Sequence, residues 1–95
     1  MKEILEYCQG EEEKGGIVIG GEFIPLKNIA KDRVSNFEFK LDNYNFERIE
    51  AIVHNHIGDH PYLSSFDRIA QVETGLPWWI VANGKIHQYK CVELL

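Results

Sequence analysis

The sequence predicts an α/β fold, with a single small domain in which a mixed, largely antiparallel β-sheet is flanked by two or three helices. Short β-branched runs of strand length alternate with glycine-containing turns, and two further segments have apolar residues at helical spacing. A chain of 95 residues is long enough for one modest core. We therefore treat residues 1–95 as one domain.

A short amphipathic helix is predicted at the N-terminus. Over residues 2–9, Ile4, Leu5 and Cys8 recur at helical spacing, and Gly10 ends the pattern. We expect this helix to pack on the sheet and to have no other role.

A β-hairpin is predicted next. Residues 15–21 form a β-branched apolar run bracketed by glycines, which is typical of a buried strand. Gly20-Gly21 predicts a tight turn into a second strand over residues 22–29. Pro25 has no backbone N–H to donate, so we expect this second strand at the edge of the sheet.

The middle of the chain is predicted to form two strands joined by a helical turn. Residues 36–41 alternate apolar and polar side chains, as in a half-buried strand. The side chains expected to face the core are Phe37, Phe39 and Leu41. Asp42 is suited to cap a turn over residues 43–47, and residues 49–54 have the composition of a buried strand.

A second helix is predicted to begin at Ser64 or Ser65, either of which is a good N-cap residue. It should run to about Thr74 and end at Gly75. The apolar side chains expected to pack on the sheet are Ile69, Ala70 and Val72.

A second hairpin is predicted to close the chain. A strand ending at Ala82 meets the turn Asn83-Gly84, the strongest short hairpin signal present, and residues 85–92 return as its partner. The strand begins with two tryptophans, at least one of which we expect in the core.

Composition argues against several classes of function. The net charge is −5 and no Lys/Arg cluster is present, so binding to nucleic acid has no electrostatic support. No apolar run approaches the roughly 20 residues needed to span a membrane, and the first residues do not resemble a signal peptide. We expect a cytoplasmic protein that binds neither nucleic acid nor membrane, with Cys8 and Cys91 as free thiols.

Two histidines and an aspartate predict a metal site. His54 and His56 end a predicted strand, and alternation along a strand turns their side chains to the same face. Asp67 can return as a third ligand, although the helix dipole alone also favours an aspartate in a first helical turn. Three protein ligands leave the fourth tetrahedral position open to water, as in catalytic zinc sites. We expect one Zn²⁺ per chain.

The spacing H-x-H-x7-S-x-x-D, formed by His54, His56, Ser64 and Asp67, resembles the signature of JAMM metalloproteases, also called the MPN+ or JAB family. The resemblance implies zinc-dependent hydrolysis of a peptide or isopeptide bond, and so a peptide or protein substrate. It also implies a layout like that of cytidine deaminases, and that Ser64 donates a hydrogen bond to the oxyanion.

The same resemblance implies a catalytic glutamate upstream. Bacterial members carry E-x-x-G before an apolar strand, which corresponds here to Glu13 through Gly16 and makes Glu13 the expected general base. Three other glutamates close to the strand remain alternatives, namely Glu11, Glu12 and Glu22.

The run T-G-L-P-W-x-I-V over residues 74–81 resembles the amino-terminal JAMM-type domain of phage tail-assembly proteins. That domain commonly precedes a cell-wall peptidase of the NlpC/P60 type, so a second peptidase domain is an implied partner. Family members have a long helix where this chain has only a turn before residue 49, so a partner or a second copy would complete the sheet cover. The alternative function is a non-catalytic assembly module of the same fold, presenting an exposed tryptophan.

Overall fold

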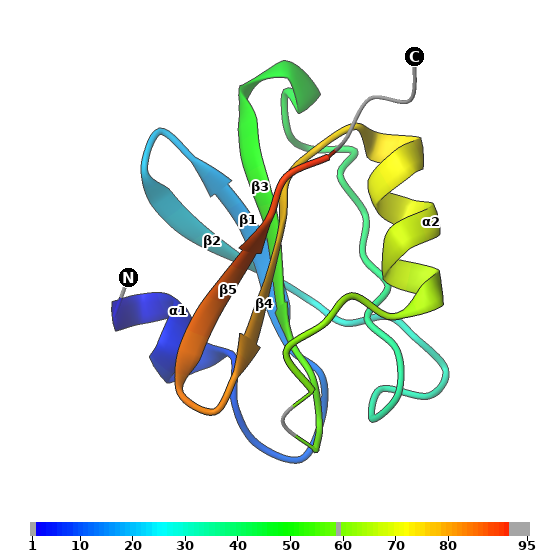
Figure 1. Cartoon of the computed structure of the whole chain (residues 1–95). Helices are drawn as coiled ribbons and strands as arrows, with labels where there is room; N and C mark the ends of the chain where they lie inside the picture. The colour runs from blue at the N-terminus through cyan, green and yellow to red at the C-terminus, as the bar shows by residue number, and fades with distance from the viewer. Residues whose placement is uncertain (1, 59, 92–95) are drawn as a thin grey trace.

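The computed structural model describes residues 2–58 and 60–91. The elements are α1 (Lys2–Tyr7), β1 (Gly15–Ile19), β2 (Glu22–Leu26), the 3-10 turn η1 (Phe46–Arg48), β3 (Ile49–Asn55), α2 (Ser65–Thr74), β4 (Trp78–Ala82) and β5 (Lys85–Tyr89). The strands form one sheet in the order β2-β1-β3-β4-β5. Within the described residues β3 and β4 are the one parallel pair of strands, and the two α-helices lie on opposite faces of the sheet (Figure 1). The small α/β domain with a mixed, largely antiparallel sheet is confirmed.

Both predicted hairpins are confirmed. Gly20 and Gly21 adopt left-handed backbone angles between β1 and β2, and Asn83 and Gly84 do the same between β4 and β5. Left-handed angles at both turn residues match the twist of the flanking strands. The strand containing Pro25 is an edge strand, as expected, although it ends three residues earlier than predicted. The expected end of the last strand at Val92 lies outside the described residues.

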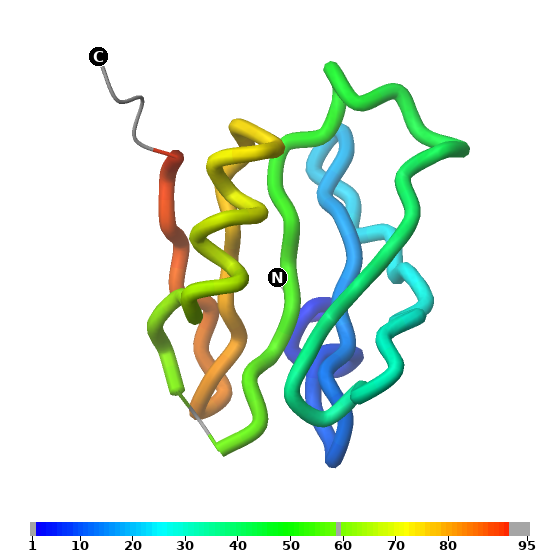
Figure 2. The backbone as a smooth tube through the Cα atoms, turned by 90° about the vertical axis from the view of Figure 1, so that its right-hand side faces the viewer, coloured from blue at the N-terminus to red at the C-terminus, as the bar shows by residue number. Residues whose placement is uncertain are grey.

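The predicted strand over residues 36–41 is wrong. This segment is irregular and lies beside α2 on the same face of the sheet (Figure 2). Its backbone bonds to a neighbouring loop, because the Glu38 carbonyl accepts from Ile29 and the Glu38 N–H donates to the Asn28 side chain. The expected core contacts are nevertheless present, because Phe37 and Phe39 stack and pack on the buried residues.

The turn before β3 is also shorter than expected. It covers Phe46–Arg48, and Asn45 caps it by accepting from the Glu47 N–H. Asp42 is therefore not its cap. Asp and Asn are both favoured at N-caps, and this stretch contains Asp42, Asn43 and Asn45, so residue type alone does not select the cap.

The sheet separates two groups of buried side chains. On the α1 side they are Ile4, Cys8, Val18, Ala51, Val53 and Val81. On the α2 side they are Ile17, Leu26, Ile49, Ile52 and Trp78. Both cysteines are free thiols, as expected, and burial raises the pKa of the Cys8 thiol to about 12.

The face of α2 that packs on the sheet differs from the prediction. Ile69 is 57% exposed and Val72 is 66% exposed, while Ala70 packs on the core between the buried Asp67 and Gln71. The helix is rotated so that a carboxylate, and not its largest apolar side chains, points inward. No tryptophan is exposed in the described residues, since Trp78 is buried and Trp79 is half-buried.

Over residues 2–58 and 60–91, none of the helices has the length and apolar character needed to cross a membrane. The longest helix, α2, has ten residues. A bilayer core requires about 20 residues of helix.

Candidate metal centre

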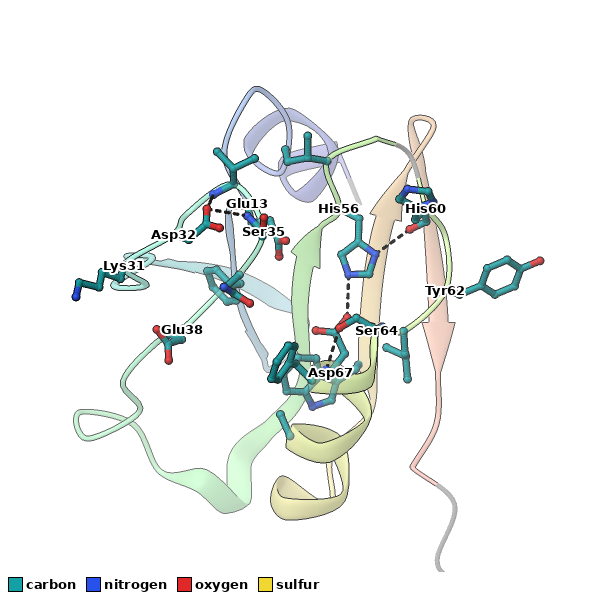
Figure 3. Close-up of a pocket in the computed structure, with 18 residues that line it drawn as sticks. Glu13, Lys31, Asp32, Ser35, Glu38, His56, His60, Tyr62, Ser64 and Asp67 are labelled. Carbon is teal, nitrogen blue, oxygen red and sulfur yellow. Dashed lines mark hydrogen bonds and ion pairs between the residues drawn. The ribbon is translucent and has the colours of Figure 1, made fainter.

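The two histidines converge on one carboxylate. His54 is the penultimate residue of β3, and His56 directly follows the last residue of the strand. Because side chains alternate along a strand, both rings point to the face of the sheet that α2 covers. The Nε2 atom of His54 is 3.0 Å from Oδ1 of Asp67, and the Nε2 atom of His56 is 2.8 Å from Oδ2. Figure 3 shows His56 and Asp67 facing each other inside the cleft.

Asp67 is held in this position by a reciprocal cap at the start of α2. The Ser64 hydroxyl accepts from the Asp67 N–H at 3.1 Å, and Oδ2 of Asp67 accepts from the Ser64 N–H at 2.9 Å. Ser64 is therefore the N-cap residue. Asp67 caps the start of α2 and also contacts both histidines. Its expected position in the first helical turn and its expected role beside the histidines are therefore compatible.

Glu13 is the acidic residue that meets the histidines from the other side. Its Oε1 atom lies 3.0 Å from Nδ1 of His54, and its side chain is buried. Of the four candidate glutamates, the other three are exposed, and Glu12 pairs with Arg33 on the surface. The structure thus brings together all five residues expected at the site, with Ser64 joined through Asp67.

Two asparagines that position this cluster were not recognised as such in the sequence. The Asn28 amide donates to the Glu13 carbonyl at 2.8 Å and to Asn36 at 2.8 Å, which ties Glu13 to the loop opposite. The buried Asn55 side chain accepts from the Lys14 N–H at 2.6 Å. The position of Asn55 between two histidines was the sequence signal for its role. A buried amide in a strand needs hydrogen-bond partners on a neighbouring segment.

The electrostatics of the cluster favour a cation. Burial alone would lower the pKa of His54, but its hydrogen bonds with Asp67 and Glu13 outweigh burial and raise the pKa to about 9. Burial alone would raise the pKa of Asp67, but the hydrogen bonds from His54 and His56 hold that pKa well below its usual range. Each ring nitrogen of His54 faces a carboxylate oxygen, so without a metal the ring carries two protons at neutral pH.

This arrangement predicts how the stability of the metal-free protein depends on pH. The raised pKa of His54 stabilises the fold fully below its ordinary value of 6.5, and this contribution is lost as the pH rises through about 9. The lowered pKa of Asp67 stabilises the fold above its ordinary value of 3.8 and is lost only in acid. We expect chelator-treated protein to melt several degrees higher at about pH 5.5 than at about pH 8.5. Equal melting temperatures at the two pH values would contradict this charge assignment.

The donor atoms fit a metal ion of the zinc type. Nδ1 of His56 is 2.8 Å from the His60 carbonyl, which can only accept, so Nδ1 carries the proton. Nε2 then faces a carboxylate oxygen of Asp67, and two such acceptors approach closely only around a proton or a metal ion. In metal sites, a histidine that binds the ion through one ring nitrogen usually donates the N–H of its other ring nitrogen to a carbonyl, a carboxylate or a water.

Two sets of three donors are present. Glu13, His54 and His56 each offer one ligand atom, and these atoms lie within 4.8 Å of one another. Asp67 instead meets the Nε2 atoms of both histidines. Glu13 meets His54 through Nδ1 and Asp67 meets it through Nε2, so the two carboxylates face different nitrogens of the same ring.

Three members of the cluster, Glu13, His56 and Asp67, line an open cleft of about 890 Å³ (Figure 3). One wall comes from the loop that contains Lys31, Ser35 and Glu38, and the opposite wall carries His60 and Tyr62. Behind the cleft, the rings of Phe37 and Trp78 pack on His54 at centroid distances of 5.5 and 5.7 Å. The volume of the cleft is in the range of ligand-binding pockets, and its apolar back wall keeps His54 from water.

Fold and site together define a small α/β domain that carries a buried histidine–carboxylate cluster beneath an open cleft. No protein-family model matches the chain. A 44-residue stretch is 52% identical to "Tail tip assembly protein K" of Escherichia phage lambda. This stretch is 46% of the present chain and 22% of that relative, so the match spans about a fifth of the relative's length. The chain therefore has partial homology to a phage tail assembly protein.

Proposed function

We propose that this chain is a zinc-dependent hydrolase of the JAMM/MPN+ type, which cleaves a peptide or isopeptide bond during phage tail assembly or bacterial protein processing. The observation that carries the proposal is the convergence of both histidine Nε2 atoms on Asp67, with Glu13 against His54, beneath an open cleft. The name of the phage lambda relative supports the setting in tail assembly.

In this proposal His54, His56 and Asp67 would hold one zinc ion, and Glu13 would act as the general base. Bound zinc supplies a Lewis acid that lowers the pKa of a coordinated water to about 7. One oxygen of Glu13 orients His54, which leaves the other to accept the proton of the attacking water. The water oxygen bonds to the carbonyl carbon, the C–N bond breaks, and Glu13 returns the proton to the departing amine.

Ser64 would stabilise the oxyanion formed during the attack. Its hydroxyl oxygen already accepts from the Asp67 N–H, so the hydroxyl proton is available for donation into the cleft. Because the N-cap role fixes this side chain, the donor is held in place before the substrate arrives.

The first test is metal content. We expect about one zinc per chain in purified wild type, lost in His56→Ala and retained in the control His60→Ala, by elemental analysis after dialysis. The control is matched because His60 lines the same cleft but touches His56 through its backbone carbonyl, which alanine keeps. Wild type without zinc, even after zinc is supplied, would remove the hydrolase proposal.

The second test separates binding from chemistry. Glu13→Gln should keep its zinc but lose hydrolysis of peptide and isopeptide libraries by at least about a hundredfold, because the amide cannot accept the proton. Glu12→Gln is the matched control, since its side chain pairs with Arg33 away from the histidines. Normal turnover by Glu13→Gln would move the base to another residue.

A non-catalytic assembly module is the second candidate. The name of the relative favours it, and so do the exposed side chains of Phe66, Ile69 and Val72 on α2, which offer a surface for a protein partner. In this alternative the cluster binds no zinc and the exposed face carries the function. The zinc content of the wild type and of His56→Ala distinguishes the two functions.

A further inference from the structure

We propose that Tyr89, on β5, is a positioning residue for the metal centre. Its hydroxyl holds the Pro61 carbonyl, and the adjoining His60 carbonyl keeps the His56 ring turned with Nε2 toward Asp67. The metal part of this inference rests on the proposed function. The orientation of the ring does not, so it can be tested without a metal.

The chain of contacts begins on the sheet and ends at the ligand. The Tyr89 hydroxyl donates to the carbonyl of Pro61, and the backbone carbonyl of Tyr89 accepts from the Gln71 amide of α2 at 2.8 Å. Tyr89 thereby links β5, α2 and the loop wall of the cleft. The carbonyls of His60 and Pro61 are adjacent, and the proline ring fixes φ, one of the two dihedral angles between them, so holding one carbonyl limits the direction of the other.

His56 needs such support because it lies beyond the end of β3. Its backbone N–H is bound to the Val81 carbonyl at 3.2 Å, which fixes the main chain. Two hydrogen bonds direct the imidazole ring, one with the His60 carbonyl at 2.8 Å and one with Asp67 at 2.8 Å, and the His54 ring lies edge-on to it at a centroid distance of 4.9 Å. Moving the carbonyl would free the ring to rotate and would weaken it as a ligand.

Tyr89→Phe removes the hydroxyl and keeps the ring, so the packing of β5 should be preserved. Loss of a contact that orients a ligating histidine typically lowers metal affinity by about 10- to 100-fold. We expect zinc affinity, measured by competition with a chromophoric chelator, to fall by about tenfold or more. Tyr62→Phe is the control, because this tyrosine lies in the same loop but is largely exposed.

A second readout uses the metal-free protein. The Nδ1 proton of His56, observed by ¹⁵N-resolved NMR, should exchange with water about tenfold faster in Tyr89→Phe, while amide protons of β3 exchange at the wild-type rate. A purely structural role for Tyr89 would speed exchange throughout the sheet and would not single out this proton.

The outcomes are distinct. Faster Nδ1 exchange with weaker zinc binding in Tyr89→Phe, and neither in Tyr62→Phe, supports the inference. Unchanged exchange and unchanged affinity would overturn it, and so would a uniform loss of protection. If wild type takes up no zinc, the hydrolase proposal fails, and the exchange measurement still decides whether Tyr89 orients His56.

Discussion

Asp67→Asn should weaken zinc binding by about a hundred- to a thousandfold. Structural zinc sites, which have four ligands, bind the ion with an apparent free energy of about 10–16 kcal/mol. One charged ligand therefore accounts for about 3 or 4 kcal/mol of the binding free energy. Asp67 is the residue that both histidine Nε2 atoms approach, at 3.0 and 2.8 Å. An amide has the same shape but no charge and only one acceptor oxygen, so it cannot face both rings as an acceptor.

This substitution also separates the metal site from the helix that carries it. Asparagine can still accept from the Ser64 N–H, so the start of α2 should keep most of its capping. Glu38→Gln is the control, because it makes the same charge change at the edge of the same cleft and away from the histidines. Zinc affinity is measured by chelator competition for both variants.

The result decides between the two donor sets in the cluster. Loss of zinc in Asp67→Asn with retention in Glu13→Gln supports His54, His56 and Asp67 as ligands. The opposite pattern would assign the third ligand to Glu13 and leave Asp67 as a helix cap that pairs with the histidines.

Gly15→Ala should destabilise the protein by about 3 kcal/mol or more, because there is no room for a side chain between β1 and β3. A Cβ atom at Gly15 would lie 2.0 Å from the Val53 carbonyl oxygen and 2.7 Å from Cβ of His54. Gly15 is the register partner of His54, so relief of the clash requires the two strands to separate. Separation would draw Glu13, two positions before Gly15, away from the histidine.

Gly20→Ala is the control for this substitution. Gly20 lies in the first hairpin turn at φ +58°, and a Cβ there would meet nothing within 4 Å. Its cost should be about 1 kcal/mol, from the left-handed backbone alone. Urea unfolding of both variants measures the difference, and a Gly15→Ala variant as stable as Gly20→Ala would show that the strands are not so closely packed.

The parts of the fold that were predictable depend on local chemistry. Both hairpins, the strand before the histidines and the capped start of α2 each follow from residues within a few positions of one another. The approach of His54, His56 and Asp67 was predictable for a related reason. A strand with period two, followed by a short loop and a helix cap, leaves few other positions for these side chains.

The irregular segment over residues 36–41 shows where local patterns fail. Its alternation correctly indicated that Phe37 and Phe39 face the core, yet it forms no strand. A strand requires a free sheet edge, and this stretch crosses the face of the sheet beside α2 instead (Figure 2). Alternation reports which side chains are buried, and it does not report whether a ladder partner exists.

The sequence alone determined the hairpins, the helix caps and the grouping of two histidines with an aspartate, because these depend on neighbours along the chain. Only the tertiary structure brought Glu13, among four candidate glutamates, to His54, which lies 41 positions away. It likewise connected Asn28 to the Glu13 backbone and Tyr89 to the loop that holds His56. Such contacts join distant segments, and their geometry follows from how the sheet packs and not from any local preference of the residues.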